Sequence, residues 1–499
     1  MLKHDLLVAF IFFKSELYRV SIVYIMIKKG IKIMIKNWFK IDVFLMLLCM
    51  MLSLPVALSA VAPNTVVATI NVGVTPAGIA LTPDNLFAYV ANNNNYSIPS
   101  GDSISVLNLV NNTLEQTIID QDFNEPYTVT INAQGTKAYV TNSNSTTISI
   151  IDIATNKIIG TINGFNGPSG MVITPDGRRA YVNNYGASQS VPSGKATTVN
   201  VVDLTTDKII GDPLEVGLAP AALAITPDGE FVYVINYVDG DIDTGTVSII
   251  KTSDNSVEMN AIQGLTGPFA IAITPDGQRA YVTNFGSNNF APIGTTISVI
   301  DLNSNTIVDT INLAIQPSGI AISPDGLFAY ATNYNTLYAG QNFSDLTAGQ
   351  GTVNIIDIAT NTVLPPTIAV GQSPDSVAIS SDGTYAYISN YTSNTVSVIA
   401  LQSFYIVAQG SQMQNVFLTQ RDIINRLTWS VSGPSLPISY SLYRDAALTD
   451  LVALIPATEP LEFLDHNREP NKTYTYYLIG TNNVGTTSVP VVVTVAGSF

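Results

Sequence analysis

The sequence predicts an all-β protein whose main part repeats a unit of four short strands. Charged residues make up only 12% of the 499-residue chain and β-branched residues are abundant, which favours a β-rich globular protein over a disordered one. A turn of the form T-P-D-G recurs along the chain, and runs of alternating apolar and polar residues follow it. No stretch has a convincing helical period.

Residues 1–60 are predicted to be an N-terminal extension with a signal peptide. A segment that starts at Met34 has a basic beginning, an apolar run from Val43 to Leu54 and small residues at 57–60, as an export signal requires. We therefore expect an exported protein, secreted, periplasmic or on the cell surface. The alternative is an uncleaved anchor, which would be the chain's only membrane contact. Met26 is another plausible start.

The repeat occupies residues 61–401. Seven copies of the turn, one of them degenerate, are spaced by 42 to 57 residues, and the shortest spacing matches a four-stranded propeller blade. In the fifth copy the expected strands are 269–274, 279–284, 296–302 and 305–311. A P-D-G turn joins the first two, because glycine supplies the positive φ that a tight hairpin needs.

The two ends of the repeat region predict how it closes. The seventh copy has three strands that end at Leu401, with no fourth. A run at Pro63–Ile70 resembles the fourth strands at 155–162 and 304–311. The sequence thus predicts a seven-bladed β-propeller whose N-terminal strand completes the last blade, which removes an open sheet edge.

A recurring motif in the repeat indicates similarity to a known family of repeats. The run A-Y-V-T-N occurs at 138–142 and 280–284 and is followed by [TI]-[SV]-[VI]-I-D. Over residues 63–401 the chain resembles the YVTN family of β-propeller repeats. The resemblance implies a seven-bladed fold, often in exported or surface-layer-like proteins. Related folds include lactonases, a streptogramin lyase and dehydrogenase subunits, so the fold does not fix a function.

Residues 402–499 differ from the repeat. They contain Trp429 in NRLTWSV, then ISYSLYRD and KTYTYYLIG. This part resembles a fibronectin type III domain, an immunoglobulin-like β-sandwich. The resemblance makes Trp429 the buried tryptophan of the second strand and Tyr474 the tyrosine-corner residue. The first strand is less clear, within 404–418. Such modules are usually spacers or docking units.

Composition excludes several chemistries from the repeat region. The chain's two histidines are His4 and His466, and its one cysteine, Cys49, lies in the targeting segment. Nucleophilic triads and histidine- or thiolate-held metals are therefore excluded there. Residues 61–499 carry 13 basic and 34 acidic residues, net −21. This charge repels phosphates, so we expect no nucleic-acid partner.

One acidic loop is a candidate metal site. Asp239, Asp241 and Asp243 alternate in DGDIDTG, like the start of a calcium loop. The pattern lacks the expected glycine and the final glutamate. Calcium is thus a possible cofactor, and an acidic solvated loop is the alternative.

An aromatic set is the candidate ligand-binding site. The residue after the motif asparagine is aromatic in five copies: Tyr185, Tyr237, Phe285, Tyr334 and Tyr391. In a propeller these positions share one face, where the connecting loops are long and rich in Asn, Ser, Gly and Tyr, as in binding surfaces. The alternative is that the rings only pack neighbouring blades. Tyr281 and its six equivalents are expected to be structural, and the Asp of I-D is expected to cap a turn.

Three functions remain open. The leading hypothesis is an exported, non-enzymatic binding or adhesion protein that uses the loop-rich propeller face to hold a glycan or protein at the cell envelope. The second is a lactonase- or lyase-like enzyme that works with carboxylates and calcium. The third is a self-assembling structural component of the envelope.

Overall fold

The computed structural model describes sixteen segments of the chain. They are residues 6–15, 18–27, 63–94, 101–186, 196–237, 244–286, 293–313, 316–334, 336–338, 346–401, 405–416, 421–432, 437–457, 461–482, 487–488 and 490–497. The chain divides into two compact units, residues 1–59 and 60–499. In the first unit, β1 (Leu6–Ser15) pairs antiparallel with β2 (Tyr18–Ile27). The sequence analysis did not anticipate this hairpin. The predicted signal peptide after Met34 lies outside the described residues.

Four-stranded antiparallel sheets repeat between residues 63 and 401, as the alternating pattern predicted, and the described strands form seven of them. The first three sheets are β4 (Pro76–Leu81), β5 (Phe87–Asn92), β6 (Ser103–Asn108), β7 (Thr113–Ile118); β8 (Pro126–Ile131), β9 (Lys137–Asn142), β10 (Thr147–Asp152), β11 (Lys157–Asn163); and β12 (Pro168–Ile173), β13 (Arg179–Asn184), β14 (Thr198–Asp203), β15 (Lys208–Glu215).

The remaining four sheets follow the same order. They are β16 (Pro220–Ile225), β17 (Phe231–Asn236), β18 (Thr244–Lys251), β19 (Ser256–Thr266); β20 (Pro268–Ile273), β21 (Arg279–Gly286), β22 (Ile293–Asp301), β23 (Thr306–Asn312); β24 (Pro317–Ile322), β25 (Phe328–Asn333), β28 (Thr352–Asp357), β29 (Thr362–Ala369); and β30 (Pro374–Ile379), β31 (Tyr385–Asn390), β32 (Thr395–Ala400), β3 (Thr65–Asn71). A small hairpin of β26 (Thr336–Tyr338) and β27 (Leu346–Ala348) precedes β28.

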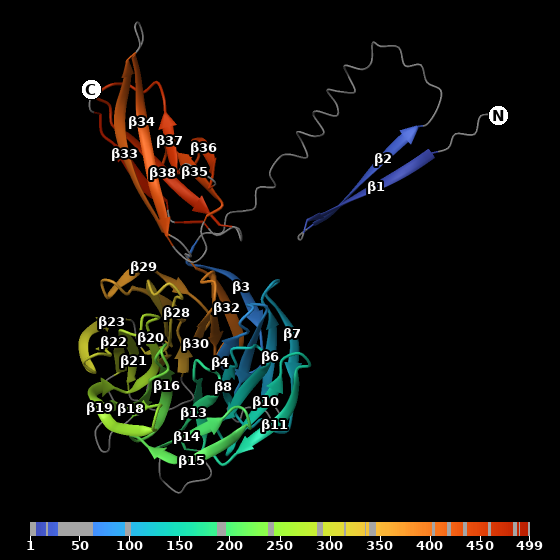
Figure 1. The fold of residues 1–499 in the computed structure, drawn as a ribbon, viewed down its shortest axis with the longest axis vertical. Helices are drawn as coiled ribbons and strands as arrows, with labels where there is room; N and C mark the ends of the chain where they lie inside the picture. Colours follow the sequence, from blue (N-terminus) through green and yellow to red (C-terminus); the bar gives the residue numbers. More distant parts are fainter. Residues whose placement is uncertain are drawn as a thin grey trace, which may run out of the picture. The chain divides into compact units, whose positions relative to one another are not determined.

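The sheets follow one another around a closed ring. The first strand of each sheet packs beside the first strands of its two neighbours, and β30 of the last sheet packs beside β4 of the first. β3 pairs antiparallel with β32 and supplies the fourth strand of the last sheet, so the two ends of the repeat region meet (Figure 1). The hydroxyl of Ser389 also donates to the carbonyl of Ala77 at 2.5 Å across this junction. The arrangement is consistent with a β-propeller.

The T-P-D-G turn closes the first hairpin of a sheet through its own hydrogen bonds. In the fifth sheet the Thr274 hydroxyl donates to the Asp276 carboxylate at 2.5 Å, and the Gln278 N–H donates to the same oxygen at 3.0 Å. These bonds lower the pKa of Asp276, the threonine bond most. Gly277 has a φ of 69°, a left-handed conformation that costs other residues energy.

The A-Y-V-T-N motif holds neighbouring sheets together. Tyr281 is fully buried, and its hydroxyl donates at 2.7 Å to Asn361, which lies in a turn of the next sheet. Asn284 is also buried, and its amide donates to Thr296 and Ser298 of the third strand. The six equivalent tyrosines are just as buried: Tyr89, Tyr139, Tyr181, Tyr233, Tyr330 and Tyr387. The predicted packing layer is confirmed, and the motif is scaffold.

The aspartate at the end of the third strand caps a turn, as expected. The Asp301 carboxylate accepts the N–H groups of Asn303 at 3.0 Å and of Ser304 at 2.9 Å. Asp152, Asp203 and Asp357 make the same kind of bond. These carboxylates are therefore used by the backbone rather than by a ligand.

The C-terminal part contains two antiparallel sheets. The three-stranded sheet comprises β33 (Tyr405–Val416), β34 (Arg421–Ser432) and β37 (Glu462–Asp465); the four-stranded sheet comprises β36 (Leu451–Pro456), β35 (Ser439–Tyr443), β38 (Tyr474–Thr481) and β39 (Val491–Val495). Both contribute to one hydrophobic core, in which Trp429 lies 5.2 Å from the ring of Tyr440. The Tyr474 hydroxyl accepts the N–H of Glu469 at 2.9 Å.

Among the described residues, no helix combines the length and the apolar character needed to cross a lipid bilayer.

Candidate binding site in the ring

The five predicted aromatic residues occupy one equivalent position in five successive sheets. The backbone N–H of Tyr185 donates at 2.9 Å to the carbonyl of Gly167, the residue before the first proline of that sheet. The same bond recurs for Tyr237, Phe285, Tyr334 and Tyr391. We call these five side chains the aromatic rim. Asn93 and Ser143 make the equivalent bond in the first two sheets.

Part of the aromatic rim forms a continuous row of rings. Phe285 lies edge-on to Tyr334 at 5.7 Å between ring centroids, and Tyr334 lies 6.3 Å from Tyr391. Phe269 of β20 extends the row, with its centroid 5.3 Å from that of Phe285. These separations are typical of favourable aromatic pairs. The row thus spans the fifth, sixth and seventh sheets.

The rim borders a cavity of about 470 Å³. The first strands of all seven sheets contribute residues to its lining, so we call it the central cavity. Tyr185, Tyr237 and Phe285 line it directly. Tyr334 and Tyr391 are connected to it through the row of rings. The structure therefore gathers all five predicted residues at one end of the ring.

The five rings have different surroundings. Phe285 is only 7% exposed and packs among its neighbours. The Tyr237 hydroxyl donates at 2.8 Å to the carbonyl of Gly286, which ties the fourth sheet to the fifth. Tyr185, by contrast, is 37% exposed and faces the cavity. The packing alternative thus describes Phe285 and Tyr237 well, whereas the Tyr185 ring is accessible from the cavity.

Three lining residues were missed by the sequence analysis: Tyr127, Phe269 and Asp375. Each is the second residue of a first strand, directly after the strand's proline, where the other four sheets have alanine or serine. The signal was present in PYTVTI, PFAIAI and PDSVAI, which depart from strands such as PSGMVI and PAALAI. These departures can be interpreted only in the folded ring, where the first strands surround one cavity.

The third residue of each first strand is small (Gly, Ala, Ser or Thr), which lets neighbouring first strands pack closely. A β-carbon on Gly319 would come within 2.6 Å of the Asp375 carbonyl, and one on Gly78 within 2.6 Å of the Tyr127 carbonyl. Neighbouring first strands therefore approach each other at backbone distance. The side chains at the second position therefore determine the chemical character of the cavity lining.

Burial raises the pKa values of both Asp375 and Tyr127. Both are only partly accessible from the cavity and are otherwise surrounded by protein. Burial raises the pKa of Asp375 to about 7. Burial also raises the pKa of Tyr127, and the nearby Asp375, Tyr185, Tyr391 and Tyr334 raise it further. Among the described residues, the Asp375 carboxylate has no hydrogen-bond donor and no cation as partner.

The candidate calcium ligands Asp239, Asp241 and Asp243 lie outside the described residues. Within the part of the chain that the structure describes, no group of three or more His, Cys, Asp or Glu side chains could hold a metal ion. Calcium thus stays a prediction from the sequence.

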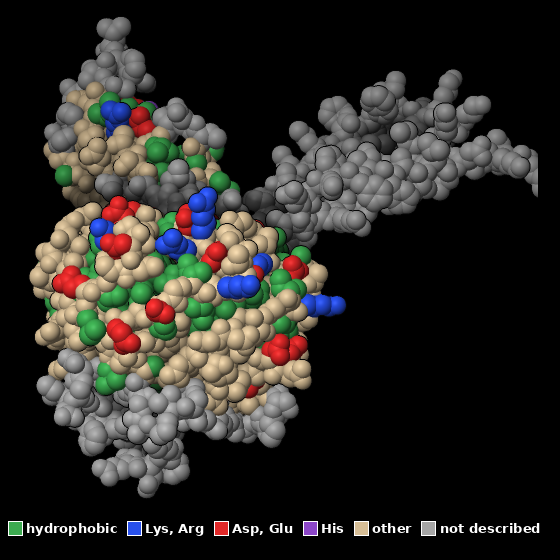
Figure 2. Space-filling model, turned by 60° about the horizontal axis from the view of Figure 1, so that its bottom comes forward, with side chains coloured by type: hydrophobic (Ala, Val, Ile, Leu, Met, Phe, Trp, Pro, Cys, Tyr) green, Lys and Arg blue, Asp and Glu red, His purple; other side chains and the backbone are tan. Residues whose placement is uncertain are grey.

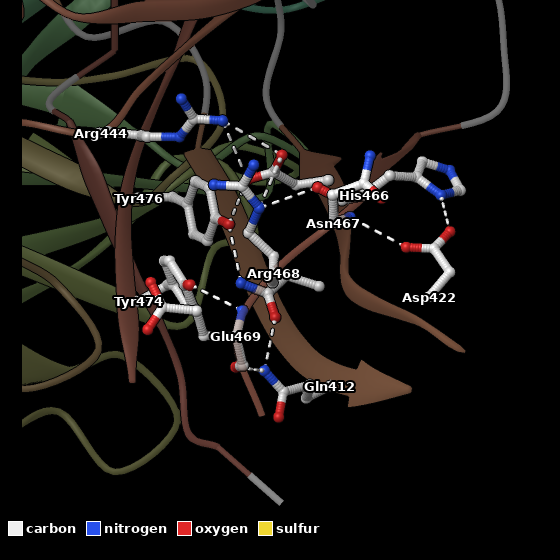
Figure 3. A network of polar contacts seen from close by, with 11 residues as sticks. Gln412, Asp422, Arg444, His466, Asn467, Arg468, Glu469, Tyr474 and Tyr476 are labelled. Atoms are coloured by element: carbon white, nitrogen blue, oxygen red, sulfur yellow. Dashed lines mark hydrogen bonds and ion pairs between the residues drawn. The ribbon is translucent and has the colours of Figure 1, made fainter. Parts of the chain in front are cut away.

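A polar network in the C-terminal part is a second cluster of titratable groups (Figure 3). Asp465 is 6% exposed; it accepts two bonds from Arg444, at 3.1 and 3.2 Å, and one from the Tyr476 hydroxyl at 2.6 Å. His466 bonds Asp422 at 2.6 Å through Nδ1. Each of these groups is used by another protein group, so the network stabilises the fold rather than forming a reaction site.

Charged side chains do not form a basic stripe on the surface in Figure 2. Acidic and basic groups are interspersed there among apolar and uncharged polar atoms.

No protein-family model matches the chain. Two proteins of Mycobacterium tuberculosis are similar to parts of it. The seven-bladed β-propeller protein Rv1057 is 31% identical over 163 residues, 32% of this chain and 37% of that protein. The PE-PGRS family protein PE_PGRS18 is 46% identical over 59 residues, 12% of this chain and 13% of that protein. The chain thus spans well under half the length of these relatives.

A solved structure, the hydrazine synthase of Kuenenia stuttgartiensis, superposes with a TM-score of 0.53. The match covers 66% of this chain and 96% of that one, at 21% identity. A likeness at this identity concerns the fold alone. Together the comparisons support a β-propeller homologue.

Proposed function

We propose that the protein is an exported, non-enzymatic binding protein that holds a group of a glycan or protein ligand in the central cavity. One observation carries the proposal: aromatic rings from several sheets converge on a cavity of about 470 Å³. Rigid scaffolds that present aromatic faces and a few polar groups in a concave site are typical of ligand binding.

We further propose that the chain is a seven-bladed propeller of the YVTN type followed by a fibronectin type III-like sandwich. Seven sheets close through β3 in the described residues. In the C-terminal part, the buried Trp429 and the bond from Glu469 to the Tyr474 hydroxyl resemble the hallmarks of that sandwich. In this view the sandwich is a spacer or docking unit, and the N-terminal segment directs export.

The proposal is tested with a panel of neutral, anionic and cationic small fragments, screened against the full-length protein by ligand-observed NMR. We expect at least one class to bind, and the Tyr185→Ala variant to weaken that binding about tenfold, as loss of an aromatic contact does. Val110→Ala, at a 75% exposed residue outside the cavity lining, is the matched control. If no fragment binds, or if Tyr185→Ala binds as well as the parent, the central cavity is not a binding site.

A second candidate function is supported by Asp375. A carboxyl group with a pKa of about 7 in a concave site has the property of a general base. A lactonase- or lyase-like reaction would therefore depend on Asp375. A hydrolysis screen with lactones distinguishes it from binding: turnover that disappears in Asp375→Asn would favour the enzyme, and binding without turnover would favour the binding protein.

A further inference from the structure

The cavity lining is negative and aromatic. Of the described residues that line the central cavity, Glu125 and Asp375 are the charged ones, and none is Lys, Arg or His. Tyr127, Tyr185 and Phe269 add ring surfaces from three different sheets. The face of an aromatic ring attracts a cation electrostatically, and this attraction strengthens when water is excluded.

Most of the other polar lining groups are used by the protein itself. The Thr128 hydroxyl donates to the carbonyl of Ser169 at 2.6 Å, and the Ser169 hydroxyl accepts the Asn183 amide at 2.6 Å. Asp375 differs, because its carboxylate has no donor or cation among the described residues. A carboxylate that is largely surrounded by protein and has no partner is costly, whereas pairing with a cation compensates that cost.

Asp375 lies where the row of rings ends. The N–H of Tyr391 donates at 2.9 Å to the carbonyl of Ser373, two residues before Asp375 in the chain. Tyr127 is close enough that the charge of Asp375 disfavours ionisation of its phenol. One carboxylate is thus bordered by neutral rings from at least two sheets. When Asp375 is ionised, this setting favours a cation over an anion.

We propose that the central cavity binds an alkylammonium group, with the aromatic rings around the alkyl carbons and the Asp375 carboxylate as counter-ion. This inference rests on the proposed binding function and names its ligand class. Rings combined with a carboxylate form the type of cage that recognises substituted ammonium ions. A lysine side chain and a free quaternary amine both carry this group, and the experiment separates the two sources.

The test measures binding of tetramethylammonium and of Nα-acetyl-lysinamide to the full-length protein by calorimetry at pH 8 and constant ionic strength. Nα,Nε-diacetyl-lysinamide, which lacks the positive charge, is the ligand control. We expect one or both cations to bind. Nα,Nε-diacetyl-lysinamide should bind at least about tenfold more weakly, because an aromatic site from which water is excluded favours a charged ligand over its neutral analogue. Preference between the two cations identifies the source.

Asp375→Asn is expected to weaken cation binding about tenfold or more at pH 8, because the counter-ion is removed. Asp212→Asn makes the same charge change at an exposed position on β15 and should bind like the parent. Equal affinity of the parent and Asp375→Asn, or equal losses in both variants, would overturn the inference.

The pH dependence of the unaltered protein tests the same point without a substitution. The titratable groups around the cavity are Glu125, Asp375 and the phenols of Tyr127, Tyr185, Tyr237, Tyr334 and Tyr391. Asp375 is mostly protonated at pH 5 and mostly ionised at pH 8, so cation affinity should rise about tenfold or more over this range. A flat profile would contradict the inference. If neutral or anionic fragments bind in a Tyr185-dependent way and the cations do not, the binding function stands and the ligand class proposed here fails.

Discussion

Single residues with the same place in the repeat have different roles in this protein. At the second position of the first strand, Ala77, Ser169, Ala221 and Ser318 are small, whereas Tyr127, Phe269 and Asp375 carry large or charged groups. The three exceptions determine the chemistry of the central cavity. By contrast, Tyr281 and its equivalents are invariant among the seven copies and serve packing. Departures from the repeat therefore mark the candidate site better than the repeat itself does.

Asp375→Asn should change how stability depends on pH. Burial raises the folded-state pKa of Asp375 to about 7 from its ordinary value of 3.8, so the native state holds a proton that the unfolded chain releases. Stability is then greatest at acidic pH and is lost as pH rises from about 4 to 7. We expect the variant to gain roughly 1–4 kcal/mol relative to the parent at pH 8 and little at pH 4, since one pKa unit is 1.36 kcal/mol. Denaturant unfolding at both pH values measures this.

Asp212→Asn is the control for that experiment, because Asp212 is exposed on the outer strand of its sheet. It should leave the pH profile of unfolding unchanged. A parent profile in which stability rises between pH 4 and 7 by an Asp375-dependent amount would contradict the burial of this carboxyl group.

At the level of the hairpin, local hydrogen bonds determine where the chain turns. Thr274, Asp276 and Gly277 satisfy one another's polar groups within the turn, so the signal for this turn is local in the sequence. This explains why the sequence predicted the first hairpin of each sheet well. The long connections after the second strand have no such motif, and the sequence predicted only their length and their polar composition.

Gly277→Ala should destabilise the protein by about 1 kcal/mol, because alanine is strained at positive φ. The residue has a φ of 69°, while its added β-carbon would find only an ordinary contact at 3.4 Å from Pro227. The cost would thus come from the backbone. The shift of the thermal unfolding midpoint measures it.

Gly160→Ala provides the comparison for the turn glycine. Gly160 lies in β11 and has no positive φ, and an added β-carbon would lie 3.7 Å from the nearest atom of Ile150. We expect it to be neutral or slightly stabilising, because glycine inside a strand costs conformational entropy. Equal destabilisation by both substitutions would argue against backbone strain at the turn.

For the whole molecule, stability depends on a contact between the two ends of the repeat region. β3 covers the outer edge of β32, and Ile70 is buried in a cluster with Val396 and Val398 of that strand. Residues 65–71 and 395–400 lie at opposite ends of the repeat region, and the sequence linked them only because the run at 63–70 resembles the fourth strands of other copies. The long-range pairing converts an open array of sheets into a ring without that free edge.

Removal of residues 1–71 should therefore weaken the fold far more than removal of residues 1–59, which leaves β3 intact. We expect the shorter chain to aggregate or to unfold at a lower temperature, because β32 would expose unpaired backbone groups and apolar side chains. Light scattering and thermal unfolding compare the two truncations. Equal behaviour of both chains would show that β3 is dispensable for closure.

The sequence was sufficient to predict the all-β class, the four-strand unit, the turn chemistry and the closing strand, because alternation, glycine turns and repeat similarity can be read along the chain. The sequence also indicated the five positions of the aromatic rim, because an aromatic residue follows the asparagine of the A-Y-V-T-N motif in five copies. The folded structure was needed to see that Tyr185 faces the cavity while Phe285 is buried, and that Tyr127, Phe269 and Asp375 line the same cavity. Those residues are about 50 or more residues apart from one sheet to another. Their proximity and the desolvation of Asp375 depend on how the first strands pack around the cavity, which no local pattern encodes.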